Sequence, residues 1–165
     1  MIDLCSQESS SMLSIEDALG RIKKAISMSK TSETVTLKNA LGRILSESAY
    51  ASINSPYERN AAMDGYAFSS SDITIGRAFS LSLIGASWAG RPFDGLLQAG
   101  QCIRIFTGAV VPAGADSVIM QEQVECDGQY IYFPVDTVAG EHVRAVGEDI
   151  QQGSLLIVAP KKINA

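Results

Sequence analysis

The sequence predicts an α+β fold in which N-terminal helices and short strands lead into a small β-barrel or β-sandwich-like module. Two observations carry this prediction. Apolar residues recur at helical spacing near the N-terminus, and short apolar runs separated by turn residues follow in the second half of the chain.

The clearest helix begins at Ser14, which forms a capping-box-like pair with Asp17. Its apolar stripe consists of Ile15, Ala18, Leu19, Ile22 and Ile26. The stretch "TSETVTL", residues 31–37, predicts a short strand, because alternating β-branched residues suit a half-buried pleat. The stretch "NALGRIL", residues 39–45, has apolar residues at helical spacing and predicts a second, short amphipathic helix.

Short strands are predicted in six runs: "FSLSLIG", "QCIRIF", "DSVIM", "QYIYF", "HVRAV" and "SLLIVA". The breaks between these runs contain the Gly, Pro and Asp residues that turns require. This spacing is typical of a small barrel or sandwich.

Composition limits the classes of partner and compartment. A hydrophobic content of 46% and a charged content of 19% are those of a globular protein. The net charge of −5 and the scattered basic residues disfavour a nucleic-acid or anionic-membrane surface, and no run approaches the ~20 apolar residues of a membrane span. Cys5, Cys102 and Cys126 lie far apart, which disfavours a disulfide framework or a structural zinc site. We therefore expect a cytoplasmic protein.

The first candidate functional residue is Asp64, which lies in "NAAMDGYAF" between Met63 and Gly65. Asp-Gly is a common turn dipeptide, and an Asp in such a turn usually caps the local backbone. Apolar neighbours favour burial instead, and a buried carboxylate needs a partner, a metal or a hydrogen-bonded ligand. The residues alone leave both interpretations open.

A second candidate is Thr107, which is followed by Gly108 at the end of a predicted strand. A hydroxyl before a glycine can present its Oγ and backbone N–H groups to an anion. The stretch is not a phosphate loop, because the pattern GxxxxGK(S/T) is absent. The alternative is a threonine that satisfies its own turn.

A third candidate is the acidic pair Glu148 and Asp149, which follows Arg144 on a predicted strand. Carboxylate oxygens suit Mg²⁺. Adjacent strand residues point to opposite faces, so at most one of the two acids is expected to share a pocket with Asp64. The alternative is a loop with solvated acids.

Three stretches in order resemble the motif series of the MoeA-like molybdopterin molybdotransferases, whose relatives include the gephyrin E domain: "AAMDGYA", "RIFTGAVVPAGADSVIMQE" and "VRAVGEDIQQGSLL". The stretch "LKNALGRIL" is similar to that family's start. The resemblance covers residues 12 to 160, which is nearly the whole chain.

This resemblance implies the domain organisation. Residues 12–52 and 140–165 would form a discontinuous first domain for linkage and dimerisation, with residues 53–139 as the inserted β-rich second domain. The family's pterin-binding third domain and its C-terminal domain have no counterpart in these 165 residues.

The resemblance also implies an activity. Family members insert molybdate into adenylylated molybdopterin and release AMP, with Mg²⁺ as a helper. They are homodimers whose cleft lies between the third domain of one subunit and the first two domains of its partner.

Carried over position by position, Asp64, Thr107 and Asp149 are the implied catalytic residues. The two aspartates would hold the metal, and Thr107 would donate to an oxyanion. The implied cofactor-binding residues are Met63, Gly65, Gly108 and Glu148.

Two departures from the family pattern matter. Arg59 and Ala61 stand where the family usually has an acid and a serine. The absence of the later domains leads us to expect either an inactive N-terminal fragment of a longer enzyme or, as the alternative, a non-catalytic dimerisation or scaffold module or a degenerate copy.

Overall fold

The computed structural model describes residues 13–27 and 31–164. The chain divides into two compact units, one formed by Met1–Arg43 with Ile163–Ala165 and the other by Ile44–Lys162. This division does not test the domain boundaries predicted at residues 52 and 139, which remain predictions. Residue 12 and Cys5 lie outside the described residues.

The first unit contains helix α1 (Ile15–Ala25), as the capping pattern predicts. The Ser14 Oγ accepts a hydrogen bond of 3.0 Å from the Asp17 backbone N–H. No residue of this helix is buried, and its apolar stripe is exposed. Within the described residues, no helix has the length and apolar character that crossing a bilayer requires.

The predicted second helix at residues 39–45 is wrong. A single 3₁₀ turn, η1 (Leu37–Asn39), is followed by Gly42 at φ +78° and then by strand β1 (Ile44–Leu45). A left-handed glycine ends a helix, which is the physical reason for the difference. Residues 31–36 also form no strand, because no described segment pairs with them as a ladder.

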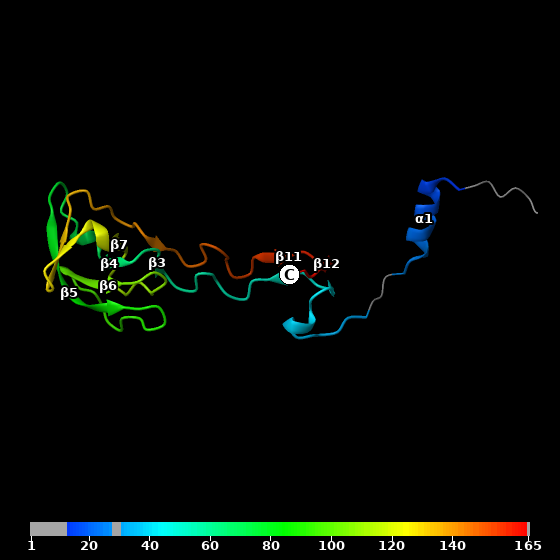
Figure 1. Ribbon diagram of the computed structural model, residues 1–165, viewed down its shortest axis with the longest axis horizontal. Helices are drawn as coiled ribbons and strands as arrows, with labels where there is room; N and C mark the ends of the chain where they lie inside the picture. Colours follow the sequence, from blue (N-terminus) through cyan, green and yellow to red (C-terminus); the bar gives the residue numbers. More distant parts are fainter. Residues whose placement is uncertain (1–12, 28–30, 165) are drawn as a thin grey trace, which may run out of the picture. The chain divides into compact units, whose positions relative to one another are not determined.

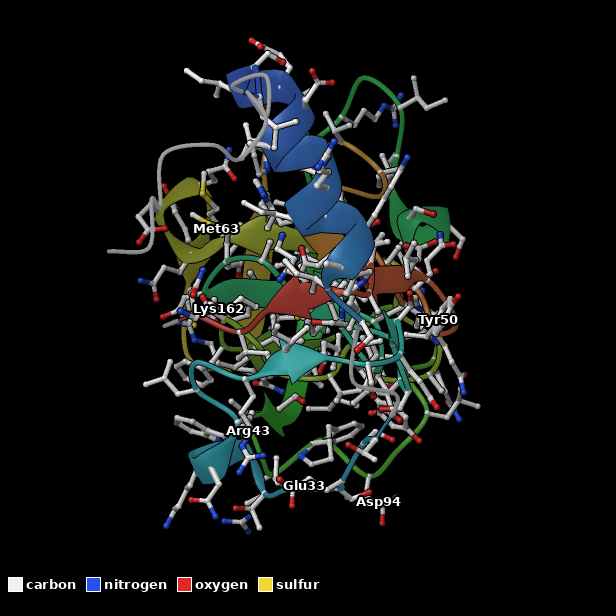
Figure 2. All side chains as sticks on the ribbon, turned by 90° about the vertical axis from the view of Figure 1, so that its right-hand side faces the viewer. Glu33, Arg43, Tyr50, Met63, Asp94 and Lys162 are labelled. Carbon is white, nitrogen blue, oxygen red and sulfur yellow. The ribbon has the colours of Figure 1, made fainter. Side chains whose placement is uncertain are left out.

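An ion pair between Arg43 and Glu33 lies beside this turn (Figure 2). Arg43 also donates from Nε to the Asn39 carbonyl at 3.0 Å. These side-chain contacts stabilise the turn that lies where a helix was expected. With one α-helix in the described part of the chain, the fold is mostly strands, and the α+β prediction with several N-terminal helices needs this correction.

In the second unit, three two-stranded antiparallel ribbons join early segments to late ones. They pair β1 with β12 (Lys161–Lys162), β2 (Ala49–Tyr50) with β11 (Leu155–Ile157), and β3 (Asn60–Ala61) with β10 (Val143–Arg144). The ribbons bring the two sides of a long insertion together, and the inserted residues form one sheet.

That sheet has six strands (Figure 1). In spatial order they are β7 (Ser117–Met120), β4 (Gly65–Phe68), β6 (Gln101–Ile105), β5 (Phe79–Ser87), β9 (Tyr130–Phe133) and β8 (Glu125–Cys126). Pairing is antiparallel except between β5 and β6. The 3₁₀ turn η3 (Gln121–Gln123) joins the edge strands β7 and β8, so the sheet curls into a half-barrel.

Four of the six predicted runs form strands of this sheet, which confirms them. The runs "HVRAV" and "SLLIVA" contribute only the short strands β10 and β11 of the ribbons. Their places are taken by β4 and β8. Strand β4 went unpredicted because its first residue, Gly65, belongs to the Asp-Gly dipeptide, which is typical of a turn.

Both faces of the sheet are buried, because neighbouring strand residues alternate between two apolar clusters. One cluster contains Ala61, Ala67, Leu97, Ile103, Ile105, Ala109, Val111, Ala115 and Val118. The other contains Phe68, Leu81, Cys102, Ile119, Ile131 and Phe133. Loops after β5 and β6 cover the first face, and the curl of the sheet closes the second.

Candidate functional site

The predicted residues Asp64 and Thr107 lie together at one end of the sheet. Gly65 at the start of β4 pairs with Ile105 at the end of β6, so the turns flanking these strands meet. Thr107 donates two hydrogen bonds to Oδ1 of Asp64, from its backbone N–H at 2.8 Å and from its Oγ1 at 2.7 Å. The structure thus joins two residues that are 43 positions apart in the sequence.

These two bonds lower the pKa of the carboxylate. The hydroxyl of Thr107, then its N–H, and finally the positive charge of Arg104 hold the pKa of Asp64 below its ordinary value, and only a small desolvation opposes them. Asp64 is exposed, and its Oδ2 accepts no hydrogen bond from a described residue. The result is an ionised, oriented carboxylate with one oxygen available to a cation or a hydrogen-bond donor.

Thr107 was expected to donate to the oxyanion of a substrate. In the structure both of its donors serve Asp64, which is an anion of the chain itself. Gly108 follows at φ +80° with open space where a Cβ would lie, and its N–H donates to the Ala61 carbonyl at 2.8 Å. This glycine secures the turn that presents Thr107.

Gly65 and Met63 flank the carboxylate differently. Gly65 is buried, and a Cβ at this position would lie 1.8 Å from the carbonyl oxygen of Ile119 on β7. The space that glycine leaves is therefore filled by the neighbouring strand. Met63 is exposed and available for contact. Ligand binding by either residue remains a prediction.

The predicted residue Asp149 does not contact Asp64 or Thr107 in the described structure. Its carboxylate pairs with Arg144, and Glu148 contacts the same guanidinium at 3.2 Å. The expectation that the two acids point to opposite faces is wrong, because residues 145–149 form a turn in place of a strand. Glu148 also accepts from the Ala145 N–H at 2.9 Å, which tightens this turn.

The residues of the candidate site fit a metal ion only in part. Among residues 13–27 and 31–164, no group of three or more His, Cys, Asp and Glu side chains could hold a metal ion. Mg²⁺ at phosphate sites typically uses one or two carboxylates and takes its remaining ligands from water and substrate oxygens. The free Oδ2 of Asp64 fits one such ligand, whereas Asp149 is engaged by Arg144.

The two departures from the family pattern have different surroundings. Ala61 is 1% exposed and belongs to a core cluster, so the hydroxyl of a serine at this position would also be buried. Arg59 donates from Nη2 to the Ala115 carbonyl at 3.2 Å. Both residues support the turns behind Asp64.

The sequence motifs did not indicate Arg104, which lies on β6 two residues before Phe106. Its Nη1 donates to the Gly65 carbonyl at 3.1 Å, and its Nη2 donates to Gln121. The pKa of Glu122 is lowered chiefly by a hydrogen bond from Gln121; the charge of Arg104 adds to this lowering, and that of Asp64 opposes it. A single arginine inside the apolar run "QCIRIF" was the signal that could have found it.

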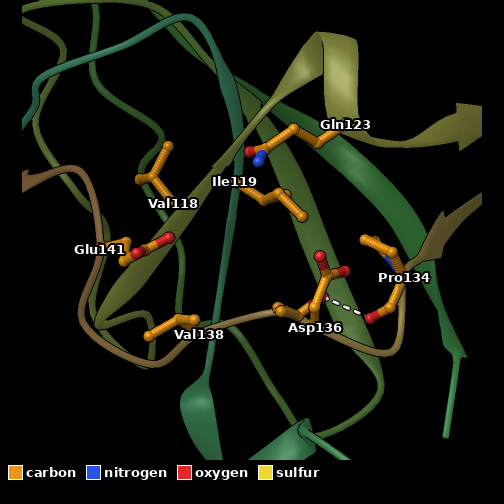
Figure 3. Close-up of a pocket in the computed structure, with 8 residues that line it drawn as sticks. Val118, Ile119, Gln123, Pro134, Asp136, Val138 and Glu141 are labelled. Atoms are coloured by element: carbon orange, nitrogen blue, oxygen red, sulfur yellow. Dashed lines mark hydrogen bonds between the residues drawn. The ribbon is translucent and has the colours of Figure 1, made fainter.

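A separate hollow lies between β7 and the loop of residues 134–141 (Figure 3). Its volume of about 20 Å³ accommodates no more than a water molecule. The dashed bond in the figure joins the Thr137 Oγ1 to the Pro134 carbonyl at 2.7 Å and closes the loop. This cavity is too small for an organic substrate.

Comparisons with known proteins agree with the motif order. Residues 13–165 match the family described as the MoeA N-terminal region (domain I and II). A molybdopterin molybdenumtransferase of Haemophilus influenzae is 36% identical over 148 residues, which cover 88% of this chain and 36% of that protein. One from Nostoc sp. is 37% identical over 136 residues, covering 81% and 31% of the two chains.

Among solved structures, a molybdopterin biosynthesis MoeA protein from Pyrococcus horikoshii superposes with a TM-score of 0.81 at 30% identity. The match covers 93% of this chain and 40% of that one. The chain thus spans about a third of the length of the curated relatives that it matches. It belongs to the MoeA N-terminal region (domain I and II) family, whose model matches residues 13–165.

Proposed function

We propose that this chain is the N-terminal part of a molybdopterin molybdotransferase, which inserts molybdate into adenylylated molybdopterin with release of AMP. The observation that carries the proposal is the Asp64–Thr107 pair, which lies in the family region and presents an ionised carboxylate at one end of the sheet. Curated relatives named molybdopterin molybdenumtransferase support the role in molybdenum cofactor biosynthesis.

Asp64 is the proposed catalytic group of this chain. Its free Oδ2 would contact Mg²⁺ or the substrate where phosphoanhydride charge develops, and Thr107 would keep the carboxylate oriented. Mg²⁺, when bound, would neutralise charge on the substrate phosphates. Asp149 would act as a second metal ligand only after exchanging its contact with Arg144.

The remainder of the site is proposed to come from the family's pterin-binding domain, in a homodimer. Asp64 is exposed at one end of the sheet, which supports a site completed by another domain. We therefore propose that the isolated chain is inactive.

The alternative is a non-catalytic dimerisation or scaffold module, or a degenerate copy. The exposed apolar stripe of α1 favours it, because Ile15, Leu19 and Ile22 are each more than half exposed. A catalytic test separates the two functions.

In that test, residues 13–165 replace the matching region of the Haemophilus influenzae relative. The chimera is expressed in a strain that lacks its own molybdopterin molybdenumtransferase, and molybdenum cofactor content is measured. We expect the chimera to restore the cofactor, Asp64→Asn to abolish it, and Asp94→Asn, which removes another exposed carboxylate, to leave it unchanged.

A folded but inactive chimera would favour the non-catalytic module. Full cofactor production by the Asp64→Asn chimera would show that the role of Asp64 is wrong.

A further inference from the structure

Beside the Asp64–Thr107 pair lies an exposed aromatic stack that the proposed function does not use. The rings of Trp88 and Phe106 are stacked with centroids 3.9 Å apart and an interplanar angle of 14°. Trp88 is 50% exposed and belongs to neither core cluster. Phe106 covers one face of the indole, and half of Trp88 remains exposed.

Cationic groups surround this stack. The Arg104 guanidinium lies 4.9 Å from the Phe106 ring centroid and 5.1 Å from that of Tyr66. Trp88 and Arg91 exchange two backbone hydrogen bonds of 3.0 Å across a tight turn. Directly opposed residues of an antiparallel pair project to the same side, so the Arg91 side chain accompanies the indole. Arg91 is exposed and forms no ion pair with a described residue.

Strand register ties the stack to the candidate site. Tyr66 lies opposite Arg104 on β4 and β6, so these two side chains share one face of the sheet. Phe106 follows Arg104 by two residues and immediately precedes Thr107. The stack and the ionised carboxylate therefore occupy the same end of the sheet.

We propose that the free face of Trp88 stacks on the planar heterocycle of the substrate, adenine or pterin, while Arg91 holds the attached phosphate. The proposal rests on the proposed function for the identity of the ligand. An aromatic face accepts a planar base irrespective of its hydrogen-bonding edges, and a guanidinium matches a phosphate bidentately. If a protein surface bound here instead, the exposed and unpaired Arg91 would have no assigned role.

The test uses Trp88 itself as the probe, because it is the chain's only tryptophan. The 165-residue chain is titrated with AMP, with 6-hydroxymethylpterin phosphate, and with ribose 5-phosphate as a control that lacks a ring. We expect saturable quenching of indole fluorescence by AMP or the pterin phosphate, with the more tightly bound ligand identifying the heterocycle. Absence of quenching by both at millimolar concentration would overturn the proposal, as would equal quenching by ribose 5-phosphate.

Variants then separate stacking from charge, with affinity measured by calorimetry. Trp88→Leu should weaken binding about tenfold, and Trp88→Phe should recover most of that loss. Arg91→Gln should weaken binding and reduce its salt dependence, whereas Arg77→Gln, which removes an exposed charge from another turn, should not. Unchanged affinity in Trp88→Leu, with circular dichroism showing an intact fold, would overturn the stacking site.

The outcomes distinguish this inference from the proposed function. If ligand affinity is independent of Trp88 while the Asp64→Asn chimera makes no cofactor, the inference fails alone. If the ring binds at Trp88 while that chimera stays active, the catalytic role of Asp64 fails and the ring site stands.

Discussion

Thr107 directs both of its hydrogen-bond donors at one oxygen of Asp64, at 2.8 Å from the backbone N–H and 2.7 Å from the Oγ1. The threonine is thus the positioning partner of the carboxylate. Hydrogen bonds to the ionised form favour it, and two of them on one oxygen restrict the orientation of the carboxylate.

The first prediction concerns the pKa of Asp64. Thr107→Val removes the hydroxyl, which is the largest cause of the lowered pKa, and should move the pKa of Asp64 back toward its ordinary value of 3.8. Carboxyl carbon NMR across a pH titration measures this shift. Thr107→Ser, which retains the hydroxyl, should keep the lowered pKa; an unshifted Asp64 in Thr107→Val would contradict the assigned cause.

The same pair predicts a dependence of stability on pH. The pKa of Asp64 is lower in the folded than in the unfolded state, so its stabilisation is present above the unfolded value and is lost as pH falls through the folded value. On acidification below about pH 4, wild type should lose more stability than Thr107→Val. Urea unfolding at a series of pH values checks this, and parallel curves for the two proteins would count against it.

Gly65→Ala should destabilise the six-stranded sheet by about 3 kcal/mol or more. The new Cβ would lie 1.8 Å from the Ile119 carbonyl oxygen, so the backbones of β4 and β7 must separate. At Gly85 the added Cβ meets the Phe93 ring at 2.9 Å, and a side chain moves more easily than a backbone. Thermal unfolding should therefore show a smaller loss for Gly85→Ala than for Gly65→Ala; the reverse order would contradict the assignment.

The cysteines of the sheet should react differently. Burial raises the pKa of the Cys102 thiol to about 12, whereas Cys126 is exposed. Iodoacetamide at pH 8 should modify Cys126 in the folded protein and leave Cys102 intact until denaturant is added. Peptide mapping by mass spectrometry reads the two sites separately, and rapid labelling of folded Cys102 would show that the strand is more open.

Ser70→Ala should destabilise the turn after β4 by about 1–2 kcal/mol. The Ser70 Oγ donates to Asp116 at 2.6 Å, and its N–H donates to the other oxygen at 2.7 Å. Burial alone would raise the pKa of Asp116, but the bonds from Ser70 and Ser117 outweigh it and lower that pKa. Chemical denaturation measures the loss, with Ser80→Ala on the surface of β5 as the control, expected within about 0.5 kcal/mol of wild type.

Part of this fold could be predicted because its signals are local. The Ser14 cap and the helix after it depend on residues within one turn, and the alternation of exposed and buried residues in "QYIYF" is complete inside its strand. Residues 39–45 were predicted as a helix because their apolar residues have helical spacing. In the structure, Gly42 takes a left-handed conformation, and Ile44–Leu45 pair as a strand with Lys161–Lys162. Pairing with a distant segment outweighed a weak local preference.

The sequence alone determined that Asp64, Thr107 and Asp149 lie in three motifs whose order resembles that of a known family. It also placed a glycine directly after Asp64. Only the tertiary structure decided which of them meet. Register between β4 and β6 brings Thr107 to Asp64, while Arg144 engages Asp149 in its own turn. Strand register depends on the packing of both faces of the sheet, which brings together residues that are distant in the chain.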